Sequence, residues 1–250
     1  MSLLAQTHPR RATEIVDASF RFYREHAGDL LVVSALLLVP PALLAAVAPD
    51  LVQWVFQVAY NLMYIVSQGV IAVYVAAAVE RDAPITAGRA LRELGDRAGN
   101  VLVVGIMAGI LMAVGFILLF VPGLIALGWF AVAIPVAAIE GLKHSAALGR
   151  SRQLARGHLL HVLGTLLLVW LIVVALVLGG ALGMGLVFAL AGVPQRLIDF
   201  ISNVLMIPLF PLAAIATTLL YYDLRVRNEG ADVEALVEEL PPGRMTSEVR

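Results

Sequence analysis

The chain has 250 residues, of which 61% are hydrophobic and 14% are charged. Soluble domains are about 45–50% apolar and about 25% charged, so this composition excludes an ordinary soluble domain and indicates a polytopic membrane protein. The net charge of −1 offers no basic field for nucleic acid, and the absence of cysteine excludes disulfides, thiolate metal sites and a cysteine nucleophile.

Residues 1–29 predict a cytoplasmic segment with one amphipathic helix. Within it, Ile15, Ser19 and Phe22 fall on one stripe with Val16, Phe20 and Tyr23, and the charged residues take the other side. The segment is too long for the charged region of a signal peptide, so we expect the first membrane helix to be retained. The amphipathic helix either lies among lipid head groups or packs on the membrane bundle.

A bilayer core of about 30 Å needs about 20 apolar residues in a helix. Six runs without a charged residue meet this length, and we predict an all-α bundle with a six-span membrane domain over 30–222 and a cytoplasmic tail over 223–250. The fourth run is short and the fifth is long, so tilt, or a break of the fifth near residues 179–183, is expected. The runs are 30–48, 54–79, 101–121, 124–139, 162–190 and 200–222.

Lysine and arginine indicate which ends of these spans face the cytoplasm. Four lie in each of the N-terminal segment, residues 80–100, residues 140–161 and the C-terminal segment, whereas the opposite turns hold only Arg196. The positive-inside rule therefore predicts that both termini are cytoplasmic.

Three similar stretches precede the odd-numbered spans, and each combines basic residues with a glycine: Gly28, Gly99 and Gly157. The chain therefore has the pattern of three units, each a cytoplasmic amphipathic helix followed by a membrane hairpin. Either duplication or shared physical demand could produce it. We expect each glycine to allow the bend into the span. The pair Gly105 and Gly109 is spaced for close helix packing, more inside the bundle than between copies.

Prolines interrupt the apolar pattern of three spans and mark candidate kinks or cavity positions. They are Pro40, Pro41, Pro135, Pro208 and Pro211. A transporter could use such broken helices, but the spans contain only amides and hydroxyls, which disfavours proton coupling. A lipid or small neutral solute remains an alternative cargo. It would be supported by a polar cavity between the first, fourth and sixth spans.

No enzyme, cofactor or metal signature is found. The sequence has no G-x-S-x-G, no P-loop and no histidine set that brings three ligands together. We therefore assign no catalytic, cofactor-binding or metal-binding residue.

A charged patch follows the sixth span at Asp223, Arg225 and Arg227. We interpret it as the water-side end of a membrane helix, with Tyr221 and Tyr222 as interface aromatics. We expect Asp223 to pair with the arginines of the preceding cytoplasmic segment. These arginines, Arg150, Arg152 and Arg156, together with Asp223, Arg225 and Arg227, are the candidate lipid or partner contacts.

Residues 118–141, residues 146–164 and the "YYDLRVR" end resemble the membrane domain of bacterial glycerophosphoryl diester phosphodiesterases and its stand-alone inner-membrane relatives. The "ATEIVDASFRFYREH" helix is similar too, and the resemblance covers about residues 12–230. Asn228 departs from it, since a basic residue is expected there. The resemblance implies a six-helix inner-membrane fold. It does not imply phosphodiesterase activity, which belongs to a separate soluble domain.

These observations favour a non-enzymatic membrane protein that organises lipid or a partner protein, and anionic head groups are the expected lipid chemistry. A homo-oligomer is compatible with the pattern. The alternatives are a transporter or channel for a lipid or small neutral solute and, last, an intramembrane enzyme.

Overall fold

A computed structural model describes residues 9–81, 85–191 and 193–238, and these fold into α-helices with no strand among them. The predicted all-α fold is therefore confirmed. The helices are α1 (Ala12–Glu25), α2 (Ala27–Val47), α3 (Asp50–Arg81), α4 (Ala87–Gly95), α5 (Ala98–Leu118), α6 (Phe120–Phe130), α7 (Ala133–Ile139), α8 (His144–Ala155), α9 (Leu159–Ala191), α10 (Gln195–Met206) and α11 (Phe210–Glu238).

Six segments of the described chain are long and apolar enough to cross a membrane, as the sequence predicts: Ala27–Val47, Asp50–Glu80, Ala98–Leu118, Phe120–Ile139, Leu159–Gly179 and Gln195–Glu229. The protein is thus a multi-pass integral membrane protein. The amphipathic helices expected before the first, third and fifth spans are α1, α4 and α8. Of the predicted tail, residues 239–250 lie outside the described part.

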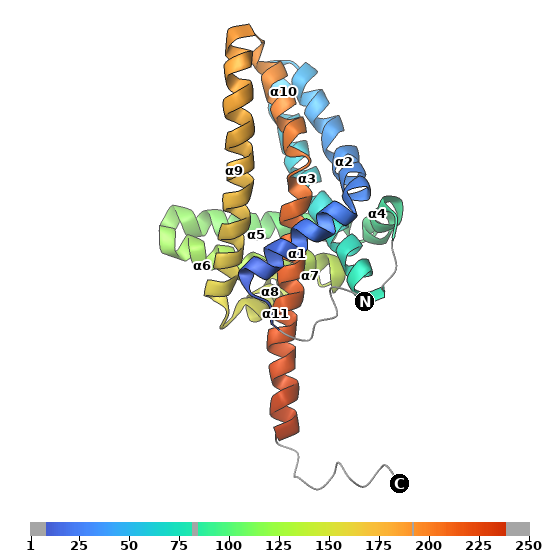
Figure 1. The fold of residues 1–250 in the computed structure, drawn as a ribbon, viewed down its shortest axis with the longest axis vertical. Coiled ribbons are helices and arrows are strands. Elements are labelled where there is room, and N and C mark those ends of the chain that lie inside the picture. The colour runs from blue at the N-terminus through green and yellow to red at the C-terminus, as the bar shows by residue number, and fades with distance from the viewer. Residues whose placement is uncertain (1–8, 82–84, 192, 239–250) are drawn as a thin grey trace.

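The bundle has two distinct ends (Figure 1). The turns at Ala48 and Pro194 lie at one end, which we call the turn end. The other end, which we call the tail end, holds the last turns of α11. Arg10 lies toward this end too, where its backbone N–H donates to Asp223 of α11. Both ends of the described chain therefore lie toward the tail end of the bundle.

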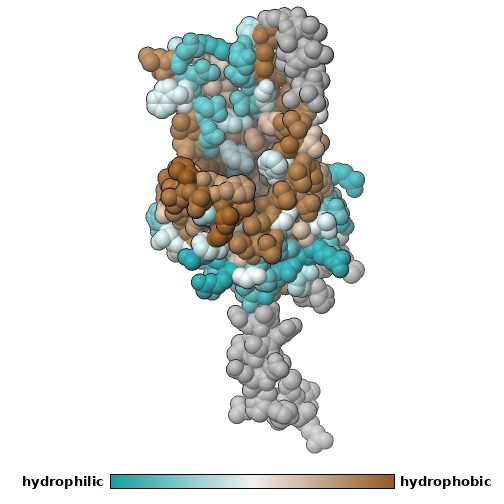
Figure 2. Space-filling model, turned by 90° about the vertical axis from the view of Figure 1, so that its left-hand side faces the viewer, coloured by the Kyte–Doolittle hydropathy of each residue, from teal (hydrophilic) through white to brown (hydrophobic). Residues whose placement is uncertain are grey.

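The hairpin formed by α5 and α6 has a different direction from the other spans. Figure 1 shows it running sideways, across α9 and α11, at the level of α1. Its tip is exposed and apolar, with Ile117 82% and Phe120 69% exposed. In Figure 2 this tip is the brown mass that faces the viewer, above a hydrophilic belt. We call α5 and α6 the lateral hairpin.

The core lies where α3, α7 and α11 meet the lateral hairpin and α8. Ile71, Val136 and Ile215 are essentially without exposed surface there. The helix α1 packs on α9 and α11 through its buried stripe of Ile15, Val16, Ser19 and Phe22. Of the two predicted placements for α1, contact with the bundle is therefore observed.

The prolines differ in their effect. Pro40 and Pro41 lie within α2, which continues through them. Pro208 lies in the turn that separates α10 from α11, and Pro135 follows the break between α6 and α7, where its missing N–H removes one helical bond. Pro211 lies in the first turn of α11, a position that needs no such bond.

Two sequence expectations about glycine are corrected. Of the two expectations for the fifth run, tilt or a break near residues 179–183, the break is absent, since α9 is one helix from Leu159 to Ala191. Of the three glycines expected at bends, only Gly157 has positive φ, at +82°, in the turn before α9. Gly28 and Gly99 lie inside α2 and α5, and the bend before α2 falls at His26 instead.

Candidate functional site

Asp223 is the centre of a buried ion-pair cluster at the tail end. Only 1% of its side chain is exposed, and its Oδ2 accepts from Arg227 Nε at 2.7 Å and lies 2.9 Å from His161 Nε2. Its Oδ1 accepts the backbone N–H of Arg10 at 2.6 Å, and Arg227 donates to the Arg10 carbonyl. The cluster therefore connects the N-terminal segment, α9 and α11.

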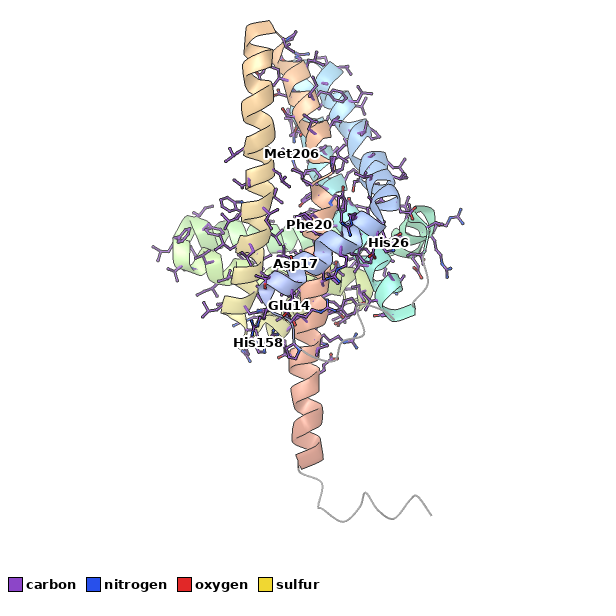
Figure 3. All side chains as sticks on the ribbon, in the orientation of Figure 1. Glu14, Asp17, Phe20, His26, His158 and Met206 are labelled. Carbon is purple, nitrogen blue, oxygen red and sulfur yellow. The ribbon has the colours of Figure 1, made fainter. Side chains whose placement is uncertain are left out.

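His158 stands beside this cluster, just before α9 (Figure 3). Its pKa is lowered from the usual 6.5 by burial and by Arg227 and His161, against the opposing effect of Asp223. Because burial and the positive charge of Arg227 both disfavour the charged form, the neutral imidazole is the form that suits this position.

A second cluster joins α7, α8 and α11. Arg150 Nε lies 3.3 Å from Glu140 Oε1, and its Nη2 donates to Glu229 at 2.6 Å. Glu229 also pairs with Arg225, one turn earlier in α11, while the hydroxyl of Tyr221 donates to Glu140 at 2.9 Å. Burial lowers the pKa of Arg150, but the bonds and charges of Glu229 and Glu140 outweigh it, so that pKa is raised.

These contacts correct the predicted pairing of Asp223. Its partners are His161, Arg227 and the backbone of Arg10, whereas Arg150 is engaged with Glu140 and Glu229. The reason is geometric: Arg227 lies one helical turn from Asp223 on the same helix and needs no approach from another segment.

Arg152 and Arg156 have a different environment. Arg152 is exposed on α8 and Arg156 is exposed just after it, and neither has an acidic partner within the described residues. The guanidinium of Arg152 lies over the ring of Trp129 in α6, 4.1 Å from its centroid. Arg152 therefore stands at the base of the lateral hairpin, held by a cation–π contact that leaves its donors available.

Several residues of the tail end were missed or misread in the sequence. Glu140, Glu229 and His161 were not among the candidates, although Arg225 and Glu229 have the i,i+4 spacing that favours pairing. Tyr221 is buried, and Tyr222 donates to Glu80 at 2.8 Å, so these aromatics bond inside the protein. Asn228, where a basic residue was expected, donates to the backbone of α8 and connects it to α11.

A polar cavity of about 250 Å³ lies at the turn end, between α2, α3 and α10. The transporter alternative would have been supported by a polar cavity between the first, fourth and sixth spans. The observed one involves the first, second and sixth spans instead, and none of the five candidate prolines lines it. Its lining is Ala42, Ala45, Ala46, Gln53, Gln57, Arg196, Asp199, Phe200, Ser202 and Asn203.

Within the described residues, no three histidine, aspartate or glutamate side chains lie together as metal ligands would. Comparison with models of known protein families, with curated proteins and with solved structures finds no match to this chain. The features that bear on function are therefore the side chains at the turn end and the tail end of the bundle.

Proposed function

We propose that this integral membrane protein has no catalytic chemistry of its own and holds anionic lipid at its tail end. The observation that supports this most directly is the division of the arginines. Arg150, Arg225 and Arg227 are committed to carboxylates inside the protein, whereas Arg152 and Arg156 stand exposed beside an apolar hairpin.

Position favours a lipid head group as the partner of these two arginines. Arg152 lies in the last turn of α8 and Arg156 directly follows that helix, so both guanidinium groups are available to one phosphate at this end of α8. The lateral hairpin, on which α8 packs, exposes Ile117, Leu118 and Phe120. Apolar side chains of this size are stable against acyl chains and unfavourable in water. One lipid can thus meet arginine with its phosphate and the hairpin with its chains.

The helix α1 adds a second lipid-facing element on another side of the bundle. Its outward face carries Phe20, which is 40% exposed, along with exposed Arg21 and Arg24 (Figure 3). An aromatic ring next to arginines is the arrangement of helices that lie in a headgroup layer. The exposed Asp17 on the same face reduces its net charge, so α8 is the stronger site.

The test is native mass spectrometry of the protein released from nanodiscs of phosphatidylcholine and phosphatidylglycerol in equal amounts. The wild type should retain phosphatidylglycerol selectively. The double change Arg152→Gln and Arg156→Gln should weaken that retention by about 2 kcal/mol, about thirtyfold in affinity, since each interfacial arginine contributes about 1 kcal/mol.

The matched control is Arg89→Gln with Arg92→Gln, which removes the same charge from exposed positions on α4. It should leave the selectivity within a factor of about three, because α4 packs on α2 and α3, whereas Arg152 and Arg156 lie at α8. An equal loss in both double variants would assign retention to net charge alone. No preference for phosphatidylglycerol in the wild type would reject the proposed function.

Three wider statements belong to the same proposal. The protein resides in a bacterial inner membrane with its tail end in the cytoplasm, which the sixteen lysines and arginines outside the opposite turns support. It is a relative of the membrane domain of glycerophosphoryl diester phosphodiesterases. It either works alone with lipid or also binds a membrane partner protein or a second copy.

A further inference from the structure

The cavity at the turn end is built mainly from uncharged polar groups. Gln53 and Gln57 come from the first turns of α3, while Ser202 and Asn203 come from α10. Amides and hydroxyls each offer both a donor and an acceptor. Three alanines at the end of α2 leave the space that these groups surround. The wall of the cavity therefore matches a ligand that donates and accepts at several neighbouring atoms.

The two charged side chains of the lining are already engaged. Arg196 donates to the Ala48 carbonyl at 3.0 Å and pairs with Asp50, which fixes the rim of α10 to the α2–α3 turn. Asp199 accepts from Gln195 at 2.9 Å. Arg196 is neutralised by Asp50, Asp199 is bonded by a neutral amide, and the two lining charges have opposite sign, so the lining as a whole carries no net charge that would select an ionic ligand.

The cavity is closed toward the middle of the bundle. Leu38, Tyr60 and Ile207 are buried together beneath it, and the Tyr60 hydroxyl lies 3.5 Å from the Asn203 carbonyl. The ring of Phe210 packs on Tyr64, with centroids 4.7 Å apart. This floor lies at the break between α10 and α11, next to Met206 (Figure 3). In Figure 2, hydrophilic surface reaches down from the turn end toward the hollowed middle of that face.

We propose that this cavity binds a small uncharged solute rich in hydroxyl groups, of the size of a hexose or hexitol. A volume of about 250 Å³ holds roughly eight waters at ~30 Å³ each, and it falls just under the ~300 Å³ typical of drug-sized ligands. The amides fit vicinal hydroxyls, while Phe200 and the alanines fit the apolar C–H faces of such a molecule. The same chemistry is presented by a free sugar and by the sugar head group of a glycolipid.

The test uses the absence of cysteine from the natural chain. An Ala46→Cys reporter, which lies in the lining, is modified by a water-soluble methanethiosulfonate reagent in phosphatidylcholine nanodiscs, with glucose or sorbitol added up to 100 mM. Either probe should slow the modification saturably, by at least fivefold. An Asp17→Cys reporter at the tail end controls for effects of the solute on the reagent and should not change.

Two substitutions assign the effect to the cavity. Gln57→Leu should raise the concentration for half-protection at least tenfold, and Gln53→Leu is a second variant should the first fold poorly. Asn61→Leu makes the same kind of change one turn along α3, outside the lining, and should leave protection unaltered. Equal effects of Gln57→Leu and Asn61→Leu would overturn the assignment.

Two further arms decide the source and the charge of the ligand. Protection by free glucose in phosphatidylcholine nanodiscs identifies a soluble ligand, whereas protection only in nanodiscs with monoglucosyl diacylglycerol identifies a lipid head group. Either result supports the proposal. Absence of protection in both arms, or equal protection by glutamate at the same concentration, overturns it. The site is at the opposite end from Arg152, so these outcomes are independent of lipid retention there.

Discussion

Replacing Asp223 by asparagine removes the charge at the centre of the tail-end cluster while keeping the shape of the side chain. Asp223 is 1% exposed, and Arg227 and His161 are 20% and 18% exposed, so water replaces little of the lost interaction. Breaking a buried pair costs about 3–5 kcal/mol, and asparagine keeps one acceptor, so we expect a loss of about 2–3 kcal/mol of unfolding free energy.

The measurement is equilibrium unfolding by SDS in mixed micelles, followed by circular dichroism. Asp223→Asn and Arg227→Gln should be made singly and together, and their losses should be non-additive by about 1–2 kcal/mol. Combined with Arg152→Gln, in contrast, Asp223→Asn should be additive, because Arg152 lies over Trp129 instead. The control Asp17→Asn, on the exposed face of α1, should change stability by less than about 0.5 kcal/mol.

Either of two results would contradict a stabilising buried pair between Asp223 and Arg227. One is a loss below about 1 kcal/mol for Asp223→Asn. The other is simple additivity of Asp223→Asn with Arg227→Gln, since two groups 2.7 Å apart in a buried pair cannot act independently.

Three further predictions follow from single contacts. Gly105→Ala should lower the unfolding free energy by about 1–3 kcal/mol, because a Cβ there would lie 2.5 Å from a side-chain carbon of Ile65. Gly109→Ala places its Cβ in open space and should raise the unfolding free energy by up to about 1 kcal/mol. Unfolding of both variants by SDS measures the two changes. Asn228→Ala should lower the unfolding free energy by about 1 kcal/mol, since its amide bonds α8 to α11. His158 has a folded pKa below its unfolded value of 6.5, so the unfolded state binds more protons as pH falls; the melting temperature should drop below about pH 6.5, and less so in His158→Gln.

The positions of the apolar helices could be predicted because a membrane span requires a long run of apolar residues, which is visible in the sequence. A span needs a run without charge, and four of the six runs coincide with α2, α3, α5 and α9 to within a few residues, whereas the fourth and sixth runs are each divided between two helices. The break at Pro208 was also predictable from its missing N–H. The glycines at 179 and 180 suggested a possible break, but α9 continues through them. In an apolar environment a helix keeps its backbone bonded even where glycine would permit a turn.

The direction of the lateral hairpin could not be predicted. Hydropathy reports that α5 and α6 avoid water, and it does not report which way they point. Their direction is set by packing on α3, α7 and α8, which depends on contacts between distant parts of the chain.

The candidate site could be predicted only in part, because its pairings also depend on contacts between distant parts of the chain. Asp223 was recognised because a carboxylate beside arginines at the end of a span is conspicuous. The predicted partner of Asp223 was wrong, because complementary charge does not specify which of several cationic side chains lies nearest. The cavity groups were visible as amides and hydroxyls in otherwise apolar runs. Only the three-dimensional arrangement brings Gln57 of α3 beside Ser202 of α10.

The lateral hairpin also has a consequence for the bilayer around the protein. The hairpin extends sideways from the upright helices at the level of α1 only, so the molecule is broader there than toward the turn end (Figure 1). With the upright helices set across a bilayer, the exposed tip at Ile117 to Val121 would displace lipid from one leaflet alone. Many copies crowded together would therefore expand one leaflet relative to the other, and a membrane relieves such an imbalance of area by bending toward the narrower side.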